Sequence, residues 1–169
     1  SSCPVLTVGP HCVEDQAMGV KIDTILVATD FSHSAHHALT YALSLAEANH
    51  ARLILIHAVP RAIQVVPSGA EIAGETMQIY DEIEAEDVAR SRQEMTHLLD
   101  SGRLRGWTPE TIIEVGPASD VILSNALKRK ADLIVMGAHH RSAAASHIPW
   151  ATASTVVANA HCPVLTVRT

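Results

Sequence analysis

The sequence predicts an α/β protein: a doubly wound open sheet of five parallel strands with helices on both faces, as in Rossmann-like folds. Three observations predict it. Short apolar runs rich in β-branched residues alternate with longer stretches whose apolar residues recur at every third or fourth position. Hydrophobic residues make up 47% of the chain and aromatic residues only 3%, so the core is aliphatic. A length of 169 residues suffices for one domain with a sizeable core.

Five apolar runs are typical of buried parallel strands, because such strands are covered on both faces. In chain order they are 24–29 (TILVAT), 52–58 (RLILIHA), 111–115 (TIIEV), 132–137 (DLIVMG) and 162–167 (CPVLTV). Ligands in such sheets bind beyond the carboxyl ends of the strands, where the strand order reverses. If the first and fourth runs are neighbours, that crevice lies between residues 30–32 and 137–142.

Helices are expected between these strands. Ser32 or Ser34 is placed to cap a helix whose small residues, among them Ala35, Ala38 and Ala42, share one face. Further helices are predicted over 82–104, from about Asp120 after the Gly-Pro turn, and over about 152–160. The segment 59–81 is punctuated by proline and glycine and is predicted to be a long irregular loop.

A six-residue repeat lies near the two ends of the chain. CPVLTV occupies residues 3–8 and recurs at 162–167. The repeat predicts that the chain is the second half of a tandem protein with the final strand of the first half attached. Residues 1–23 would then be a strand-like segment and linker, and residues 24–169 the domain. Strand 162–167 would lie at a sheet edge, where segment 3–8 is able to pair with it in its own chain or in a partner.

Composition excludes several classes of function. The formal charge of −6 does not favour nucleic acid or anionic membranes, and the basic run 128–130 falls at a predicted helix end, where it offsets the helix dipole. The three cysteines form no CxxC pair, no apolar run approaches the roughly 20 residues of a membrane span, and no secretory leader pattern is visible. We expect a cytoplasmic protein without nucleic-acid or membrane partners. The chain carries no GxSxG, HExxH or Walker A motif, so we expect no enzyme.

Five segments carry a family resemblance. They are ILVATDFS (25–32), LILIHAV (53–59), EVGPASDVI (114–122), DLIVMGAHHRS (132–142) and HCPVLTVR (161–168). In order and spacing they resemble the universal stress protein family over about residues 21–169. The resemblance implies an adenine nucleotide alpha hydrolase-like fold, a role in the stress response, and a homodimer or pseudo-dimer through strand 162–167.

Nucleotide-binding members of that family carry glycine, two residues, glycine, nine residues, then Gly-Ser or Gly-Thr after the fourth strand. Gly137 matches the first position, but His140 stands at the second and Trp150-Ala151 at the last pair. Glycines let main chain approach the phosphates, and the last pair offers N–H groups at a helix N-terminus. His140 and Trp150 therefore predict that tight ATP binding fails.

Other parts of the nucleotide site match better. The resemblance implies a candidate site for ATP or AMP, although no cofactor is expected; its members are Asp30, Val59, Met136, Gly137, Arg141, Ser142 and Thr152. Each of three residues also has a structural interpretation. Asp30 is able to bond backbone amides in a turn before a helix, Gly137 to permit a turn, and Met136 to belong to the core.

Eleven histidines raise the question of a metal. His33 with His36 or His37 lies on one helical face, and His139 and His140 end the fourth strand. If those strands are adjacent, His33, His37, His139 and His140 open onto one crevice and are able to hold Zn²⁺ or Ni²⁺, with Asp30 as a further ligand. Solvated or hydrogen-bonded histidines are the alternative. The favoured function is thus a non-catalytic regulatory stress protein acting as a dimer or tandem-domain assembly, without robust ATP binding; an ATP or AMP sensor and a metal-binding variant are the alternatives.

Overall fold

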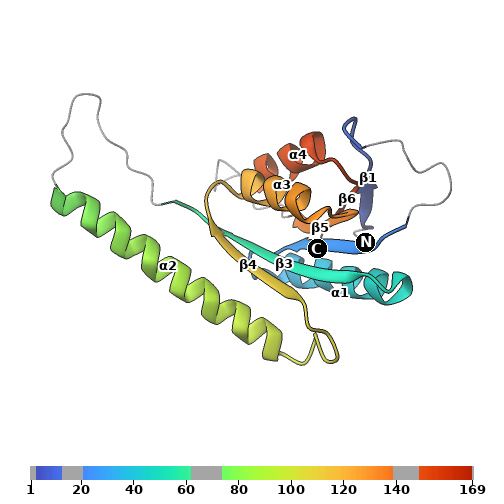
Figure 1. The fold of residues 1–169 in the computed structure, drawn as a ribbon, viewed down its shortest axis with the longest axis horizontal. Coiled ribbons are helices and arrows are strands. Elements are labelled where there is room, and N and C mark those ends of the chain that lie inside the picture. Colours follow the sequence, from blue (N-terminus) through green and yellow to red (C-terminus); the bar gives the residue numbers. More distant parts are fainter. Residues whose placement is uncertain (1–2, 13–20, 62–73, 139–148, 169) are drawn as a thin grey trace.

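The computed structural model describes residues 3–12, 21–61, 74–138 and 149–168, which form a six-stranded sheet with helices on both faces (Figure 1). The strands are β1 (Val5–Thr7), β2 (Thr24–Ala28), β3 (Arg52–Val59), β4 (Glu110–Val115), β5 (Leu133–Ala138) and β6 (Val164–Arg168). The helices are α1 (His33–Asn49), α2 (Gly74–Asp100), α3 (Ala118–Arg129) and α4 (Pro149–Asn159). The five predicted strands are confirmed, each shifted by at most two residues at either end.

The order of the strands reverses next to β2, between β2 and β5. The order is β1-β6-β5-β2-β3-β4, and β2 pairs in parallel with β3 on one side and β5 on the other. The chain thus runs outward through β3 and β4, then returns to the far side of β2 with β5 and β6. The predicted adjacency of the first and fourth apolar runs is confirmed, so the carboxyl ends of β2 and β5 flank the crevice.

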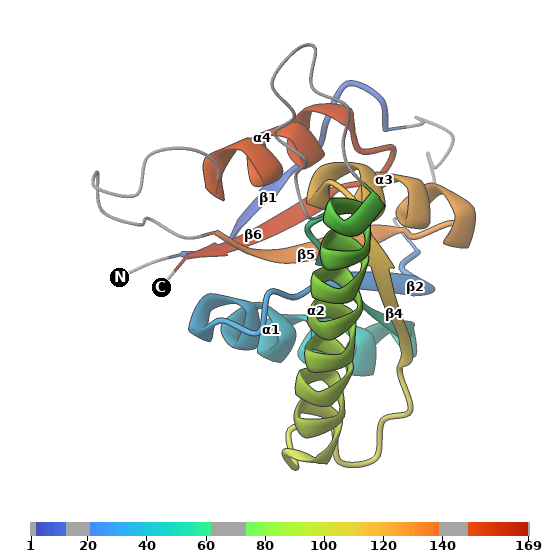
Figure 2. The same cartoon turned by 90° about the vertical axis from the view of Figure 1, so that its left-hand side faces the viewer.

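The sequence predicted five strands for this domain and gave segment 3–8 as a possible partner of the last one. The sixth strand of the sheet is this segment. β1 lies antiparallel beside β6, and the pairs are Val5 with Thr166, Leu6 with Leu165, and Thr7 with Val164. The first copy of the repeat therefore covers the edge of the second within one chain. Figure 2 shows β1 at this edge, beside β6.

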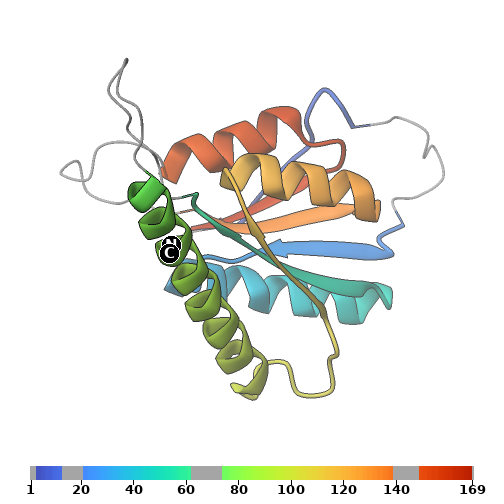
Figure 3. The ribbon, with the colours of Figure 1, turned by 60° about the vertical axis from the view of Figure 1, so that its left-hand side comes forward.

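Two aliphatic cores lie on the two faces of the sheet. α1 and α2 cover one face, and α3 and α4 cover the other (Figures 2 and 3). Alternate residues of the strands serve the two cores: Ile25 and Val27 point toward α1, whereas Leu26 and Ala28 point toward α3 and α4. The small residues predicted for one face of α1 are buried there, which lets this helix lie close to the sheet.

Helix α2 departs from the prediction at both ends. It begins at Gly74 rather than at Glu82, and it ends at Asp100 rather than at Leu104. Its C-terminal half packs on the sheet through Met95 and Leu98, but Ile79 and Ile83 are exposed. An apolar stripe running from Ile83 through Met95 and Leu98, which the sequence also suggests, is therefore buried only in its C-terminal part. The first turns of α2 show no apolar stripe in the sequence, so no helical periodicity indicated a helix there. Residues 62–73 of the predicted loop lie outside the described residues.

No helix in the described part of the chain combines the length and the hydropathy that crossing a bilayer requires.

Candidate functional site

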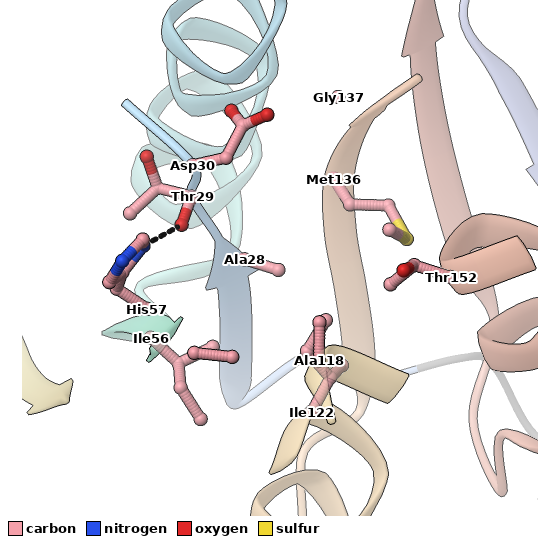
Figure 4. Close-up of a pocket in the computed structure, with 11 residues that line it drawn as sticks. Ala28, Thr29, Asp30, Ile56, His57, Ala118, Ile122, Met136, Gly137 and Thr152 are labelled. Carbon is pink, nitrogen blue, oxygen red and sulfur yellow. Dashed lines mark hydrogen bonds between the residues drawn. The ribbon is translucent and has the colours of Figure 1, made fainter. Parts of the chain in front are cut away.

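A cavity opens at the carboxyl ends of β2 and β5, where the strand order reverses. Its volume is about 160 Å³. Eleven described residues line it: Ala28, Thr29, Asp30, Ile56, His57, Ala58, Ala118, Ile122, Met136, Gly137 and Thr152. Figure 4 shows Met136 and Thr152 on one side and Thr29, Asp30 and His57 on the other. The wall is thus mainly aliphatic, with a few polar groups from the ends of β2 and β3 and from α4.

The turn after β2 fixes the position of Asp30. The carboxylate oxygen Oδ1 of Asp30 accepts hydrogen bonds from the backbone N–H of Ser32, at 3.1 Å, and from the Ser32 hydroxyl. Thr29 Oγ1 accepts the backbone N–H of Phe31 at 3.0 Å. These bonds hold Phe31 at a φ of 59°, in the left-handed region that a bulky side chain rarely occupies. The turn interpretation of Asp30 therefore describes its geometry.

The same turn leads directly into α1. Ser32 is the N-cap of this helix, and its hydroxyl accepts the backbone N–H of Ala35 at 3.3 Å. Of the two cap candidates the sequence offered, Ser32 takes the role, while Ser34 is fully buried. One serine thus caps the helix and orients the carboxylate that lines the cavity.

His57 contributes a ring to the wall beside the turn. Its Nδ1 lies 2.8 Å from the carbonyl oxygen of Thr29 (Figure 4). Its ring centroid lies 4.5 Å from that of Phe31. A carbonyl oxygen only accepts hydrogen bonds, so Nδ1 carries the proton. In the neutral ring, Nε2 is then the hydrogen-bond acceptor.

Gly137 is required by packing. A Cβ atom added there would lie 2.8 Å from the backbone N of Ala35 and 2.8 Å from both the carbonyl carbon and the hydroxyl of Ser34. Real Cβ atoms do not approach backbone so closely, so the end of β5 contacts the first turn of α1 only because residue 137 lacks a side chain. This close contact, rather than a turn, explains the glycine.

The charge lining the cavity is negative. Among the described residues, the wall contains the carboxylate of Asp30 and no cationic side chain. Met136 lines the cavity and also belongs to the core under α3 and α4, with 6% of its surface exposed. α4 begins at Pro149, so Trp150-Ala151 falls in its first turn, as the comparison with nucleotide-binding members implied.

The structure brings four of the seven predicted nucleotide-site residues to this cavity: Asp30, Met136, Gly137 and Thr152. Val59 does not line it. Its side chain is buried, and its carbonyl accepts the N–H of Gly116 at 2.9 Å. Arg141 and Ser142 lie outside the described residues. Ligand binding by any of these residues stays a prediction.

The predicted metal residues are only partly placed. The rings of His33 and His37 lie 4.5 Å apart on α1, whereas His139 and His140 lie outside the described residues. Partial burial, then the charge of Arg103, lowers the pKa of the neighbouring His36. Over the described residues, no three histidine, cysteine or acidic side chains gather closely enough to hold a metal ion. A metal site that includes His139 and His140 stays a prediction.

Several cavity residues were not predicted from the sequence: Thr29, Ile56, His57, Ala118 and Ile122. His57 carried a readable signal, because it is the one polar residue between Leu53 and Val59 in an otherwise apolar strand. Ala118 and Ile122 come from the start of α3. Their position depends on which face α3 covers, and the local sequence does not state that.

Comparison with known proteins identifies the fold and the family. The model of the universal stress protein family matches residues 21–168. A universal stress protein from Thermus aquaticus, encoded 3′ of a QAH/OAS sulfhydrylase gene, is 32% identical over 148 residues, which cover 86% of this chain and 98% of that protein.

Two solved structures show how the match extends. The universal stress protein UspA from Lactobacillus plantarum superposes with a TM-score of 0.71 at 24% identity, covering 89% of this chain and 100% of that one. A protein of unknown function from Pseudomonas aeruginosa superposes with a TM-score of 0.66 at 23% identity, covering 98% of this chain but only 52% of that one. On the family match and the Thermus relative, this chain belongs to the universal stress protein family.

Proposed function

We propose that this chain is a cytoplasmic, non-catalytic regulatory protein of the stress response. It works in a dimeric or tandem-domain assembly and does not bind ATP tightly. The observation that carries the proposal is the character of the cavity beyond β2 and β5. That cavity is small and mainly aliphatic, and the only charge among its described lining residues is the carboxylate of Asp30.

The size and charge of the cavity argue against a triphosphate. Pockets that enclose a whole small-molecule ligand measure roughly 300–1,000 Å³, whereas this cavity measures about 160 Å³. Its volume suits a heterocyclic base better than a complete nucleotide. Phosphate sites are built from main-chain N–H groups and cations. The sequence places His140 and Trp150 where the resemblance would require glycines, so main chain is not bared for phosphates.

The hydrogen bonds around the cavity support a non-catalytic role. Catalysis by a side-chain nucleophile needs that nucleophile within hydrogen-bond reach of a base. Here the Nδ1 of His57 donates to a backbone carbonyl, and the hydroxyl oxygen of Thr29 accepts a backbone N–H. These bonds hold the turn together rather than linking a nucleophile to a base.

A sensor of adenine nucleotides is the second candidate. The cavity lies at the topological position where doubly wound folds bind nucleotides, and its aliphatic wall with Thr29, His57 and Thr152 suits an adenine or a ribose. One solved universal stress protein with this fold is a complex with cAMP; its TM-score is 0.53 at 23% identity, so the likeness extends to the fold alone.

Calorimetric titration of the chain with adenosine, AMP and ATP tests the proposal. We expect ATP to bind with a Kd weaker than about 1 µM and no more tightly than adenosine, because the phosphates find no partners. Submicromolar ATP binding, or ATP binding more than about tenfold tighter than adenosine binding, would contradict the proposal and favour the sensor.

Two matched variants show whether a ligand whose binding heat is measured by calorimetry binds in this cavity. Ala118 lines the cavity, and the next residue of α3, Ser119, does not. Ala118→Trp fills the opening and is expected to abolish residual adenosine binding, whereas Ser119→Trp leaves it unchanged. Equal effects of the two substitutions would place the ligand elsewhere.

A further inference from the structure

A histidine followed by a cysteine occurs twice in the chain, as His11-Cys12 and as His161-Cys162. The first pair comes after β1, and the second comes before β6. Because β1 and β6 are antiparallel, the end of β1 lies beside the start of β6. The structure therefore brings two segments from opposite ends of the sequence, each with a thiol and an imidazole, to the same corner of the sheet.

A turn after β1 folds Cys12 back toward this corner. The β1–β6 register, continued two residues beyond its last pair, places Gly9 opposite Cys162. The backbone N–H of Cys12 donates to the carbonyl oxygen of Gly9 at 3.2 Å. This hydrogen bond is that of a four-residue turn, in which the first and last Cα atoms lie within about 7 Å. Cys12 thus returns to the residue that faces Cys162.

Close packing of Gly9 fixes the position of the turn. A Cβ atom added to Gly9 would lie 2.9 Å from the carbonyl oxygen of Val157 and 3.7 Å from that of Ala160. The main chain at residue 9 therefore lies directly against the C-terminal end of α4, where only glycine fits. Figures 1 and 3 show the turn after β1 beside this end of α4. The turn is held two residues from Cys162 along the chain.

The side chains of the two segments are close as well. The rings of His11 and His161 meet edge to face, with their centroids 6.2 Å apart. The charge of Cys12 is the second cause, after burial, of the raised pKa of the Cys162 thiol. An electrostatic interaction of that kind acts over a short distance. The two thiols are therefore neighbours in the folded chain.

The two thiols differ in their exposure to solvent. Cys12 is half-buried, whereas Cys162 is 7% exposed and belongs to the core under α3 and α4. A cavity of about 120 Å³ borders Cys162, which leaves its sulfur room to move. Over the described residues, no three histidine, cysteine or acidic side chains lie closely enough to share a metal ion. Paired thiols, one accessible and one behind it, are typical of cysteines that sense oxidants.

We propose that Cys12 and Cys162 form a reversible disulfide when the chain meets a peroxide, and that this bond fastens β1 to the edge of the sheet. Disulfides of this transient, redox-sensing kind are the ones that occur in a reducing compartment. The inference goes beyond the proposed function and holds whatever the cavity beyond β2 and β5 binds.

The oxidation begins at Cys12, because burial raises the pKa of the Cys162 thiol to about 12 and keeps it protonated at neutral pH. The thiolate sulfur of Cys12 attacks one peroxide oxygen, the O–O bond breaks, and hydroxide leaves. The sulfur of Cys162 then attacks the resulting sulfenic acid, so that the S–S bond forms, the S–O bond breaks and a second hydroxide leaves. The two thiol protons convert both hydroxides to water. Each sulfur loses one electron and each peroxide oxygen gains one, and a small thiol reverses the bond by exchange.

The bond matters because little else holds β1. This strand has three residues, and the side chains of Val5 and Leu6 are 49% and 58% exposed. A strand that buries so little apolar surface opens at low cost. A disulfide from Cys12 to Cys162 closes a long loop and removes most of the entropy that β1 gains when it leaves β6. Oxidation therefore keeps the edge of β6 covered.

Peroxide treatment of the 169-residue chain tests the proposal, with Cys12→Ala and Cys3→Ala as a matched pair. The register places Cys3 opposite Arg168, six residues from Cys162, or about 20 Å. We expect the Cys162 thiol to be lost at least about tenfold faster in the native chain and in Cys3→Ala than in Cys12→Ala. Alkylation of the remaining thiols and peptide mapping measure this loss. Cys3 is the more exposed cysteine, so exposure alone would give the opposite ranking.

Hydrogen exchange of the native chain supplies a readout that needs no variant. Amides of residues 5–8 are expected to exchange at least about tenfold more slowly after oxidation, and a small thiol should restore the original rate. Three results would overturn the proposal: equal loss of the Cys162 thiol in Cys12→Ala and Cys3→Ala, a disulfide that involves Cys3 or joins two chains, or equal exchange in the oxidised and reduced protein. ATP titration is read separately and is unaffected by any of them.

Discussion

The crevice beyond β2 and β5 differs from the edge formed by β1 and β6 in how far the sequence keeps the residues that each would need for binding. At the crevice, the glycines that nucleotide-binding members carry are replaced by His140 and Trp150, while Asp30 and Gly137 are kept. At the edge, a whole strand is present twice, and its two copies pair with each other. A phosphate site depends on bare main chain at a few positions, so we expect two side chains to be enough to remove it. A strand edge depends on backbone hydrogen bonds and alternation, which the repeated strand preserves.

Restoring the glycines of the phosphate-binding motif is expected to have the largest effect on the difference between the crevice and the edge. The triple variant His140→Gly, Trp150→Gly and Ala151→Ser recreates the glycine spacing that begins at Gly137. Two regained charge-assisted hydrogen bonds contribute about 3 kcal/mol, so we expect ATP affinity to rise roughly a hundredfold. Calorimetry of the variant beside the native chain checks this. If ATP affinity stays unchanged, the loop side chains are not what excludes the phosphates.

Gly137 sharpens the comparison, because at the crevice it is kept for packing. Gly137→Ala puts a methyl group 2.8 Å from backbone atoms of Ser34 and Ala35, and we expect the free energy of unfolding to fall by about 2 kcal/mol. Gly102→Ala is the control: a Cβ there meets nothing within 4 Å, and its φ of 75° costs about 1 kcal/mol. Urea denaturation compares the two variants. A smaller loss for Gly137→Ala would restore the interpretation of Gly137 as a ligand contact.

The cysteines of the two repeat copies give the smallest effect. Cys3 is exposed and Cys162 is buried, and burial raises the pKa of the Cys162 thiol to about 12 from 9.0. Since the thiolate is disfavoured only in the folded state, this contribution to stability is complete below pH 9 and is lost as pH rises toward 12. Between pH 8 and 10.5 we expect a loss of roughly 2 kcal/mol at most.

Urea denaturation across this pH range measures the loss, and Cys162→Ala is the control that should reduce it. Cys3→Ala should leave the pH dependence as it is. If both variants respond to pH as the native chain does, the titrating group is not Cys162.

The sequence was sufficient for the elements whose apolar patterns are regular. Strands β2 to β6 and the small-residue face of α1 follow from such patterns, and Asp30 and Gly137 follow from the rule that ligands bind at strand ends. The first turns of α2 were missed because their sequence shows no regular spacing of apolar residues, and Ile79, where the description of side chains begins, is exposed. His57 is held at the cavity by its hydrogen bond to the turn after β2. Ile122 lines the cavity because of the sheet face that α3 covers. Both depend on tertiary packing rather than on local pattern.

The central claim is that the crevice of this chain does not hold a triphosphate tightly, and the content of the protein after native purification tests it most directly. The protein is denatured, and the released small molecules are quantified by mass spectrometry. We predict far less than one adenine nucleotide per chain, with no enrichment of ATP over AMP. One ATP per chain, retained through purification and lost in Ala118→Trp but not in Ser119→Trp, would contradict the claim.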